Sequence, residues 1–242
     1  MNDSLTARQT QILKILVDEY IDSANPVGSE ILERKYRLGV SSATVRSEMV
    51  ELTKKGYLKQ PHTSAGRIPT SKAMKFYVGQ LMEERSMSLS DEVKVKTEVM
   101  KAKDNTDNLM EELTESLSDV TNSLAISAIE DGRSWHYGLS HVFDNPEFCD
   151  LAICGGVLSF LESGEEVNDL FFHRLNWENP VEVLFGEELG FPELKLVGLT
   201  ATTFNLGGKR AALAVLGPTR IKYQVVIPVV RHINNLMNSL GW

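Results

Sequence analysis

The chain has 242 residues, of which 42% are apolar and 24% charged, the composition of an ordinary globular protein of about two domains. No apolar run approaches the roughly 18 residues of a membrane-spanning helix. The first residues, MNDSLTARQTQ, have neither the basic start nor the apolar core of a signal peptide. These features argue against membrane and secreted proteins, and we expect a cytoplasmic protein.

Charge is distributed unevenly along the chain. Residues 1–85 carry 13 Lys/Arg and 10 Asp/Glu, a net charge of +3, whereas residues 86–242 carry 12 and 23, a net charge of −11. Between Arg34 and Lys75, ten basic side chains stand against two acidic ones, a net charge of +8. Positive charge gathered in this way indicates contact with a phosphate backbone. We expect a DNA-binding N-terminal domain attached to a regulatory or assembly domain.

The first two expected elements are helices. Thr6 and Gln9 have the spacing of a capping box, apolar residues follow on one face, and Asn25-Pro26 ends this helix, which we place up to about residue 22. A second helix is expected from about Ser29 to Tyr36, with a turn at Gly39.

A third helix is expected to follow, capped by Ser41 or Ser42 and ended by Gly56. Its buried stripe, spaced i, i+4, i+7, consists of Val45, Met49 and Leu52. Its other side begins with small polar residues, which let a helix backbone approach base edges in the major groove. Arg46 is the only long donor there, and guanine and phosphate are equally good partners for it. The residues expected to read bases are Ser41, Ser42, Ala43, Thr44, Arg46 and Ser47.

A short hairpin is expected next, with residues 57–60 and 67–69 as extended arms around the polar loop 61–66. Gly66 is expected to supply the turn geometry, and a further helix runs from residue 71 to about 84. Together these elements predict a winged helix-turn-helix DNA-binding domain over residues 1–85. The alternative is a winged helix used for protein contacts, which does not require ten basic residues around one helix and loop. The residues expected to contact phosphates or the adjacent minor groove are Lys54, Lys59, His62, Thr63, Ser64 and Arg67.

Residues 86–125 are expected to form a helical linker. Its first half is polar, and apolar residues then recur at spacings of 3, 4, 3 and 4, as in an a/d seam of two heptads. The seam consists of Met110, Leu113, Leu117, Val120 and Leu124. Two interpretations stay open. The helix pairs with a second copy of the chain, or it is an amphipathic helix that packs on its own domain.

Residues 126–242 mix the periods of strands and helices, which predicts an α+β domain. The apolar runs that suit strands are Leu151–Val157, Leu194–Leu199 and Ala211–Leu216. Residues 147–161 and 221–240 also allow helices. Pro228 lies inside the second of these patterns and is expected to kink the helix or mark its start.

No pattern predicts an enzyme, a metal site or a cofactor. Cys149 and Cys154 lack further ligands at metal-site spacing, and the five histidines are scattered. The segment Gly207-Gly208-Lys209-Arg210 lacks the spacing of a phosphate loop, so we expect a turn there. The glycine/arginine-rich loop of a biotin ligase–repressor is also missing.

Several segments resemble one known family. The motifs SSATVRSEM and HTSAGRIPT follow LTARQTQILKILVDEYIDSANPVGS, and together they are very similar to the N-terminal module of the HrcA repressors. Towards the C-terminus, DNPEFCDL, FGEEL and LAVLGPTRIKYQVVI resemble the PEF, IGEE and GPTRMxY segments of the same family, with Ile221 in place of the Met. Roughly 90 residues of the family pattern are missing between Ile126 and the PEF segment.

The resemblance implies a homodimeric repressor of heat-shock (chaperone) genes that binds an inverted-repeat operator called CIRCE. It implies a GAF-like C-terminal domain, which we expect over residues 126–242 in reduced form because of the missing segment. It also implies that a GroEL-type chaperonin modulates repression. The alternative is a winged-helix regulator whose C-terminal domain senses a small-molecule ligand.

Overall fold

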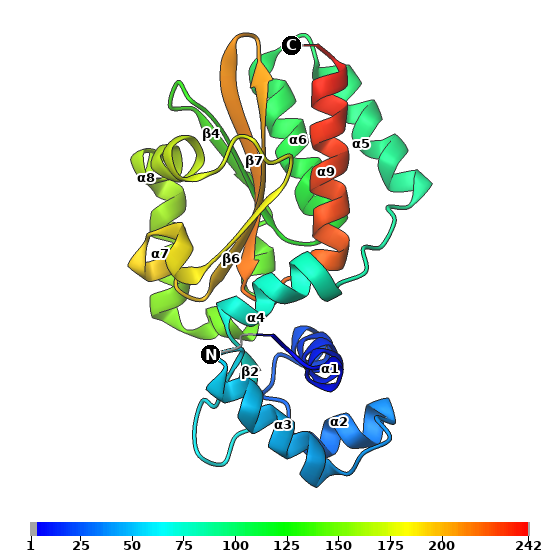
Figure 1. Cartoon of the computed structure of the whole chain (residues 1–242). Coiled ribbons are helices and arrows are strands. Elements are labelled where there is room, and N and C mark those ends of the chain that lie inside the picture. Colours follow the sequence, from blue (N-terminus) through cyan, green and yellow to red (C-terminus); the bar gives the residue numbers. More distant parts are fainter. Residues whose placement is uncertain (1–3, 242) are drawn as a thin grey trace. The chain divides into compact units, whose positions relative to one another are not determined.

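The computed structural model describes residues 4–241, and the chain forms two compact units, Met1–Glu83 and Glu84–Trp242 (Figure 1). We refer to them as unit 1 and unit 2. The combination of helices with two antiparallel sheets confirms the α+β class. Residues 86–125, expected as a separate linker, fold as part of unit 2. Among residues 4–241, no helix is both long and apolar enough to cross a membrane.

Unit 1 begins with the three expected helices: α1 (Ala7–Ser23), α2 (Ser29–Tyr36) and α3 (Ser42–Lys54). The capping box of α1 is present, because Thr6 Oγ1 accepts from the Gln9 amide and the Gln9 side chain accepts from the Thr6 amide. Ser41, not Ser42, caps α3. The predicted stripe of α3 is buried against the apolar face of α1. The fully buried part of this core includes Ile12, Leu13, Leu16, Val17, Leu32, Val45 and Leu52.

A two-stranded antiparallel hairpin follows, formed by β1 (Leu58–Lys59) and β2 (Ile68–Pro69). The last helix of unit 1, α4 (Ser71–Phe76), continues as a π-helical turn over Tyr77–Leu81. It therefore ends before the expected residue 84, because Met82 already has an extended backbone. Buried Tyr77 donates a hydrogen bond to Asp18, which ties this last helix to α1.

Unit 2 is built on a five-stranded antiparallel sheet with the order β4-β3-β7-β6-β5. The strands are β3 (Leu124–Ile129), β4 (Ser134–Tyr137), β5 (Glu182–Phe185), β6 (Val197–Leu206) and β7 (Lys209–Pro218). Gly207 and Gly208 join β6 to β7 with φ angles of 58° and 82°. Two consecutive positive φ angles are what a tight hairpin requires, so the glycine pair makes a turn, as the sequence predicted.

Helices cover both faces of this sheet (Figure 1). The helices α5 (Leu89–Ala102), α6 (Thr106–Thr121) and α9 (Tyr223–Ser239) lie on one face. The helices α7 (Leu151–Glu162) and α8 (Gly164–Asp169) lie on the other. The side chains of β3 alternate accordingly. Leu124, Ile126 and Ala128 join the core on the α7 side, while Ser127 lies opposite and its Oγ is 2.6 Å from Thr114 Oγ1 on α6.

The predicted seam of residues 110–124 lies mostly inside unit 2. Met110, Leu113 and Leu117 are fully buried within the single chain, and Val120 is only partly exposed. Leu124 is not on the helix at all, because α6 ends at Thr121 and Leu124 begins β3. Of the two interpretations, this burial agrees with an amphipathic helix that packs on its own domain. These residues leave no exposed a/d seam on α6.

The structure decides between the alternatives left open at two places in the C-terminal half. The run at residues 151–157 is not a strand but the start of α7, whose first turn is capped by Asp150 Oδ1 accepting from the Ala152 amide at 2.9 Å. A short apolar run suits both structures, and here the apolar pattern continues to Leu161, long enough for a helix. Pro228 does not mark the start of α9, which begins at Tyr223.

The helix α9 continues through Pro228 because another donor replaces the missing one. Proline has no N–H, so the carbonyl of Gln224, four residues earlier, loses its helical hydrogen bond. The Arg85 amide donates to that carbonyl at 2.9 Å. The segment before α5 therefore supplies the hydrogen-bond donor that α9 lacks at Pro228.

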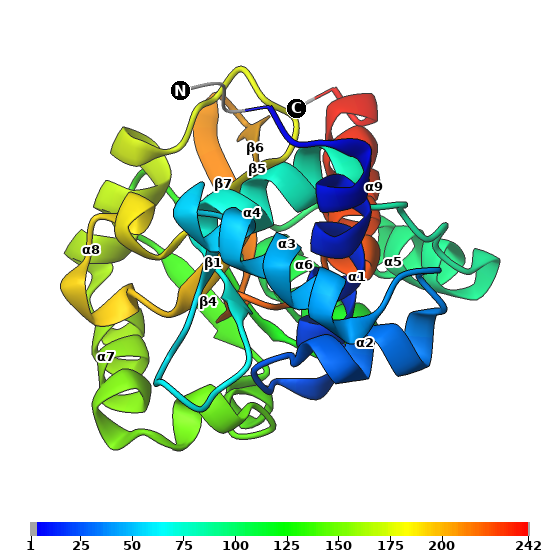
Figure 2. The ribbon, with the colours of Figure 1, turned by 60° about the horizontal axis from the view of Figure 1, so that its bottom comes forward.

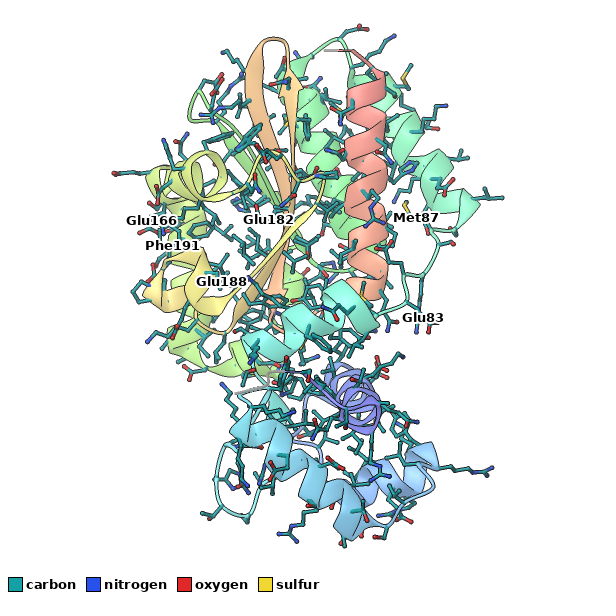
Figure 3. All side chains as sticks on the ribbon, viewed as in Figure 1. Glu83, Met87, Glu166, Glu182, Glu188 and Phe191 are labelled. Carbon is teal, nitrogen blue, oxygen red and sulfur yellow. The ribbon has the colours of Figure 1, made fainter. Side chains whose placement is uncertain are left out.

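The C-terminal motif segments meet in the folded unit. Arg220 of GPTRIKY makes a mostly buried bidentate ion pair with Glu147 of DNPEFCDL, with N–O distances of 2.5 and 2.9 Å. In the FGEEL segment, Glu188 (labelled in Figure 3) accepts from the Phe185 amide at 3.1 Å and closes the turn after β5. The Arg220–Glu147 pair thus joins the segment after β7 to the segment before α7.

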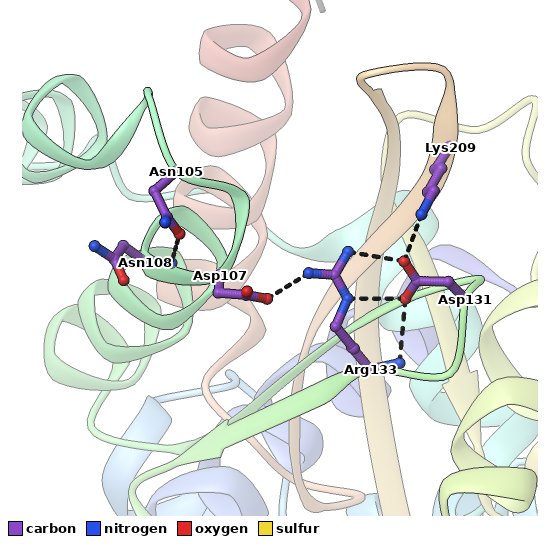
Figure 4. Close-up of polar contacts among 6 residues, drawn as sticks. All are labelled: Asn105, Asp107, Asn108, Asp131, Arg133 and Lys209. Atoms are coloured by element: carbon purple, nitrogen blue, oxygen red, sulfur yellow. Dashed lines mark hydrogen bonds and ion pairs between the residues drawn. The ribbon is translucent and has the colours of Figure 1, made fainter.

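Charged side chains fix three surface segments of unit 2 to one another (Figure 4). Asp131, between β3 and β4, accepts from Arg133 at 3.0 and 2.7 Å and from Lys209 Nζ at 2.8 Å. Arg133 also donates to Asp107 in the first turn of α6. Hydrogen bonds from Arg133 and then Lys209 hold the pKa of Asp131 well below its usual range. Because the groups are exposed, the network orients these turns more than it stabilises the fold.

Candidate nucleic-acid interface

The helix α3 is fixed in rotation by its buried stripe, and this sets which residues face solvent. Ala43, Arg46 and Ser47 are exposed on its other side, while Ser42 and Thr44 are partly exposed. Ser41 Oγ accepts from the Thr44 amide at 3.3 Å, so this hydroxyl is used as the helix cap. Figure 2 views unit 1 from the side on which α3 and the β1–β2 loop lie. The side chains predicted to read bases thus share an accessible surface at the start of α3.

Arg46 is the long donor on this surface, and it is free to bind. Its side chain is exposed, and no acidic group among residues 4–241 pairs with it. Lys59, on β1, is likewise exposed and unpaired within that range. Lys54 pairs with Glu51 at 2.7 Å, but both groups are solvent-exposed on one helix face. Such a pair contributes little, so Lys54 can exchange Glu51 for a phosphate at small cost.

The loop between β1 and β2 is ordered by a residue that the sequence did not single out, Gln60. Its Nε2 donates to the carbonyl oxygens of Thr63 and Ala65 at 2.9 and 3.0 Å. The Ala65 amide also donates to the His62 carbonyl at 2.9 Å, and His62 Nδ1 lies 3.2 Å from Ser64 Oγ. The exposed side chains of the loop are therefore presented on a fixed turn. The only sequence signal for Gln60 was an amide at the entrance of a polar loop.

Arg67 was predicted to contact phosphate, and part of its side chain is used for a contact within unit 1. Its Nε donates to Thr53 Oγ1 of α3 at 3.2 Å, and the side chain is half-buried. Its backbone forms a bridge with Val27, with N–O distances of 2.9 and 2.8 Å. Arg67 therefore links the hairpin to α3 and to the connection between α1 and α2. Among residues 4–241, no other side chain competes with a phosphate for the rest of the guanidinium.

Gly66 is needed for space and not for turn geometry, which corrects the expectation. Its φ is not positive, whereas a Cβ added there would lie 2.4 Å from the Val27 carbonyl oxygen and 2.8 Å from the Pro26 carbonyl carbon. Both contacts are with backbone atoms. Glycine thus allows the loop to pack directly on the connection between α1 and α2.

Several of the basic residues counted in the sequence are used inside unit 1. Lys35 pairs with buried Glu19 at 2.5 Å, and Tyr36 donates to the same carboxylate at 2.8 Å. The hydrogen bond from Lys35 lowers the pKa of Glu19, whereas burial, followed by the bond to Glu19, raises the pKa of Tyr36. Lys55 donates to the Ser4 carbonyl and to the Gln9 side chain at 2.8 and 3.0 Å. The freely available positive charge is therefore smaller than the +8 counted in the sequence.

Comparison with known proteins supplies independent information. A family model described as the HrcA protein C-terminal domain matches residues 41–227. The chain is 25% identical to the heat-inducible transcription repressor HrcA of Symbiobacterium thermophilum, over 97% of this chain and 98% of that one. It is 30% identical to the HrcA repressor of Acetivibrio thermocellus over 98% of this chain and 64% of that one.

The alignments also show that the chain is short. The match to the Symbiobacterium protein extends over 336 positions, so at least 94 of them (336 − 242) have no counterpart here. This agrees with the predicted absence of roughly 90 residues. Among solved structures, one described only as a hypothetical protein at 2.2 Å resolution superposes with a TM-score of 0.73 at 17% identity, covering 97% of each chain. That likeness shows a shared fold.

Proposed function

The chain belongs to the HrcA family of heat-inducible transcription repressors, and on that premise we propose that it is a sequence-specific DNA-binding repressor. Unit 1 is its reader, a winged helix-turn-helix in which α3 enters the major groove and the β1–β2 loop is the wing. Unit 2 is a reduced GAF-like domain that joins two readers into a homodimer. Its relatives are named as transcription repressors, and a binding role of this kind involves no catalysis.

The observation that carries this proposal is the unpaired, exposed Arg46 beside small side chains on the first turns of α3. A helix approaches base edges closely only if its leading side chains are small, and Ala43 and Ser47 meet that condition. Arg46 then supplies the bidentate donor for a guanine or the charge for a phosphate. Ser42 and Thr44 add short polar groups on the flank.

Phosphate contacts come from the two sides of this helix. Lys54 and Lys59 are exposed near its C-terminal end, and His62, Thr63 and Ser64 are presented on the Gln60-ordered loop. These groups position the reader without carrying sequence information. Arg67 holds the loop against α3 and offers its remaining N–H groups to the backbone.

The proposed operator is an inverted repeat of the CIRCE type upstream of chaperone genes. One α3 reads one half-site, so two copies of the chain match the two-fold symmetry of the repeat. In this proposal a GroEL-type chaperonin keeps the repressor active, which agrees with the name of its relatives, heat-inducible transcription repressors. A cell under heat stress then derepresses chaperone genes as unfolded protein occupies the chaperonin.

The test is footprinting on inverted-repeat fragments with and without chaperonin. Protection of both half-sites, strengthened by chaperonin, is the expected result. Failure to protect any inverted repeat would refute the repressor function. Protection that does not respond to chaperonin but changes with a metabolite, together with a thermal shift by that metabolite, would favour the ligand-sensing alternative.

A further inference from the structure

The helix α5 has two apolar faces, and unit 2 covers only one of them. Val95 and Val99 are fully buried, and α5 packs on α6. On another face Leu89, Val93 and Met100 are 80%, 63% and 39% exposed. Figure 1 shows α5 as the outermost helix on its side of the sheet. The fold of unit 2 therefore does not use these three side chains.

The three residues form one continuous stripe along the helix. With Lys96 between them, the positions 89, 93, 96 and 100 repeat at spacings of 4, 3 and 4, the spacing of a coiled-coil seam. Single exposed apolar residues are common on protein surfaces and need no explanation, but an aligned set on one helix indicates a contact surface. We call Leu89, Val93, Lys96 and Met100 the outer stripe of α5.

We propose that the outer stripe binds the outer stripe of a second copy, α5 against α5 in antiparallel orientation, and that this contact forms the dimer. The inference rests on the proposed function, which requires two DNA-reading units to match an inverted repeat. The chain lacks at least 94 positions of its relative, and the α6 residues that suggested a seam are buried. The outer stripe offers the apolar surface that those residues do not.

Charge along α5 selects the antiparallel orientation. Its N-terminal part carries Asp91 and Glu92 and no basic residue. From residue 94 to residue 103 there are four lysines and one glutamate. Lys94 pairs with Asp119 of α6 and Lys101 pairs with Glu98, each at 2.8 Å, so Lys96 and Lys103 carry the remaining positive charge of this end. Antiparallel packing places the acidic end of each helix beside the basic end of the other, whereas parallel packing brings like charges together.

The outer stripe also fits an antiparallel register. Antiparallel seams pair a and d positions, so Leu89 of one copy faces Met100 of the other and Val93 faces the aliphatic stem of Lys96. One flank of the stripe consists of Ser90 and Thr97, which are exposed, short and uncharged. Short side chains there let the two helices approach closely.

Sedimentation velocity of the full-length chain tests the surface. We expect a dimer for the unmodified chain and a monomer for Leu89→Glu/Val93→Glu, with the dissociation constant raised at least ~100-fold, because four carboxylates enter an apolar contact. The matched control is Leu151→Glu, which changes an 87% exposed leucine on α7 and leaves the dimer intact. All changed positions are exposed, so far-UV circular dichroism should stay unchanged. A monomeric unmodified chain, a dimeric double variant or a dissociated control would each overturn the inference.

Cysteine cross-linking tests the orientation in a Cys149→Ser background, since Cys149 is an exposed thiol. Leu89→Cys/Met100→Cys should form an inter-chain disulfide under mild oxidation, and Leu89→Cys alone should not. Efficient cross-linking of the single variant would show parallel packing and refute the antiparallel arrangement. Absence of cross-linking in both would refute the contact.

The test of this dimer surface and the test of the proposed function can fail independently of each other. Mass and cross-linking do not involve DNA, so a dimer through the outer stripe can be found even if no operator is bound. Conversely, a double variant that stays dimeric while the chain still protects an inverted repeat refutes this surface and leaves the repressor function standing.

Discussion

Gly66→Ala offers a sharp test of how the hairpin is held in unit 1. The new Cβ would lie 2.4 Å from the Val27 carbonyl oxygen and 2.5 Å from its carbon, and neither backbone atom can rotate away as a side chain could. Overpacking of this kind costs typically about 1–3 kcal/mol. The displacement also breaks the two hydrogen bonds between Val27 and Arg67, each contributing about 1 kcal/mol. We expect unit 1 to lose roughly 3–5 kcal/mol of unfolding free energy.

The assay is hydrogen exchange by mass spectrometry, read on peptides from α1, α3 and the hairpin, because it reports the opening of unit 1 separately from unit 2. The control is Gly79→Ala, where an added Cβ meets no atom within 4 Å and φ is not in the left-handed region. It should be neutral or slightly stabilising, since alanine is a better helix former. Unchanged exchange in Gly66→Ala, or equal losses in both variants, would refute the space argument.

Three further predictions follow from the same contacts. Arg46→Ala should lose about 1–3 kcal/mol of operator binding and relax specificity if Arg46 contacts a base. Equal losses on operator and random DNA in fluorescence anisotropy would assign it to phosphate, and Lys195→Ala, an exposed charge in unit 2, is the control. Since the pKa of Glu19 is lowered from 4.5, its contribution is fully present above about pH 4.5 and is lost as pH falls through the folded-state pKa. Glu19→Gln should therefore flatten the acid side of the stability profile of unit 1, and an unchanged profile in urea titrations would contradict this. Glu147→Ala should destabilise unit 2 by about 3–5 kcal/mol in urea unfolding, because it removes the carboxylate from a mostly buried ion pair in which the Arg220 side chain is only 12% exposed, and a loss below 1 kcal/mol would contradict the pairing.

The sequence predicted the local structure of unit 1 well because its signals are local. The capping box at Thr6, the stripe of α3 and the glycine at residue 56 each act within a few residues of the chain. Unit 2 was harder to predict because its elements depend on distant partners. The run at 151–157 suits a strand or a helix equally, and the helix α9 passes through Pro228 only because the Arg85 amide reaches Gln224 from the other end of the unit.

The candidate site shows the same division between local and distant information. Spacing alone predicted which face of α3 is exposed, because the buried stripe fixes the rotation of the helix. It could not show that Gln60 orders the loop or that Arg67 reaches Thr53, since each is a tertiary hydrogen bond between side chains with many possible partners. The two interpretations of the apolar seam at residues 110–124 could not be separated from the sequence for a related reason. A heptad pattern indicates that one face of a helix is apolar, but it does not indicate what covers that face. In the structure, the sheet of unit 2 covers it.

The structure reduces the number of basic side chains in unit 1 that are available to bind phosphate. Ten basic residues between Arg34 and Lys75 suggested a broad phosphate-binding surface. Lys35 and Lys55 are used in contacts within unit 1, and Lys72 donates to the Lys55 carbonyl and lies 4.6 Å from the Tyr57 ring centre. The basic groups that stay exposed and without an acidic partner among residues 4–241 include Arg46 and Lys59, together with Arg34 and Arg37 at the end of α2. Positive charge thus serves two purposes here, since part of it stabilises unit 1 and the remainder is left for the proposed contact with DNA.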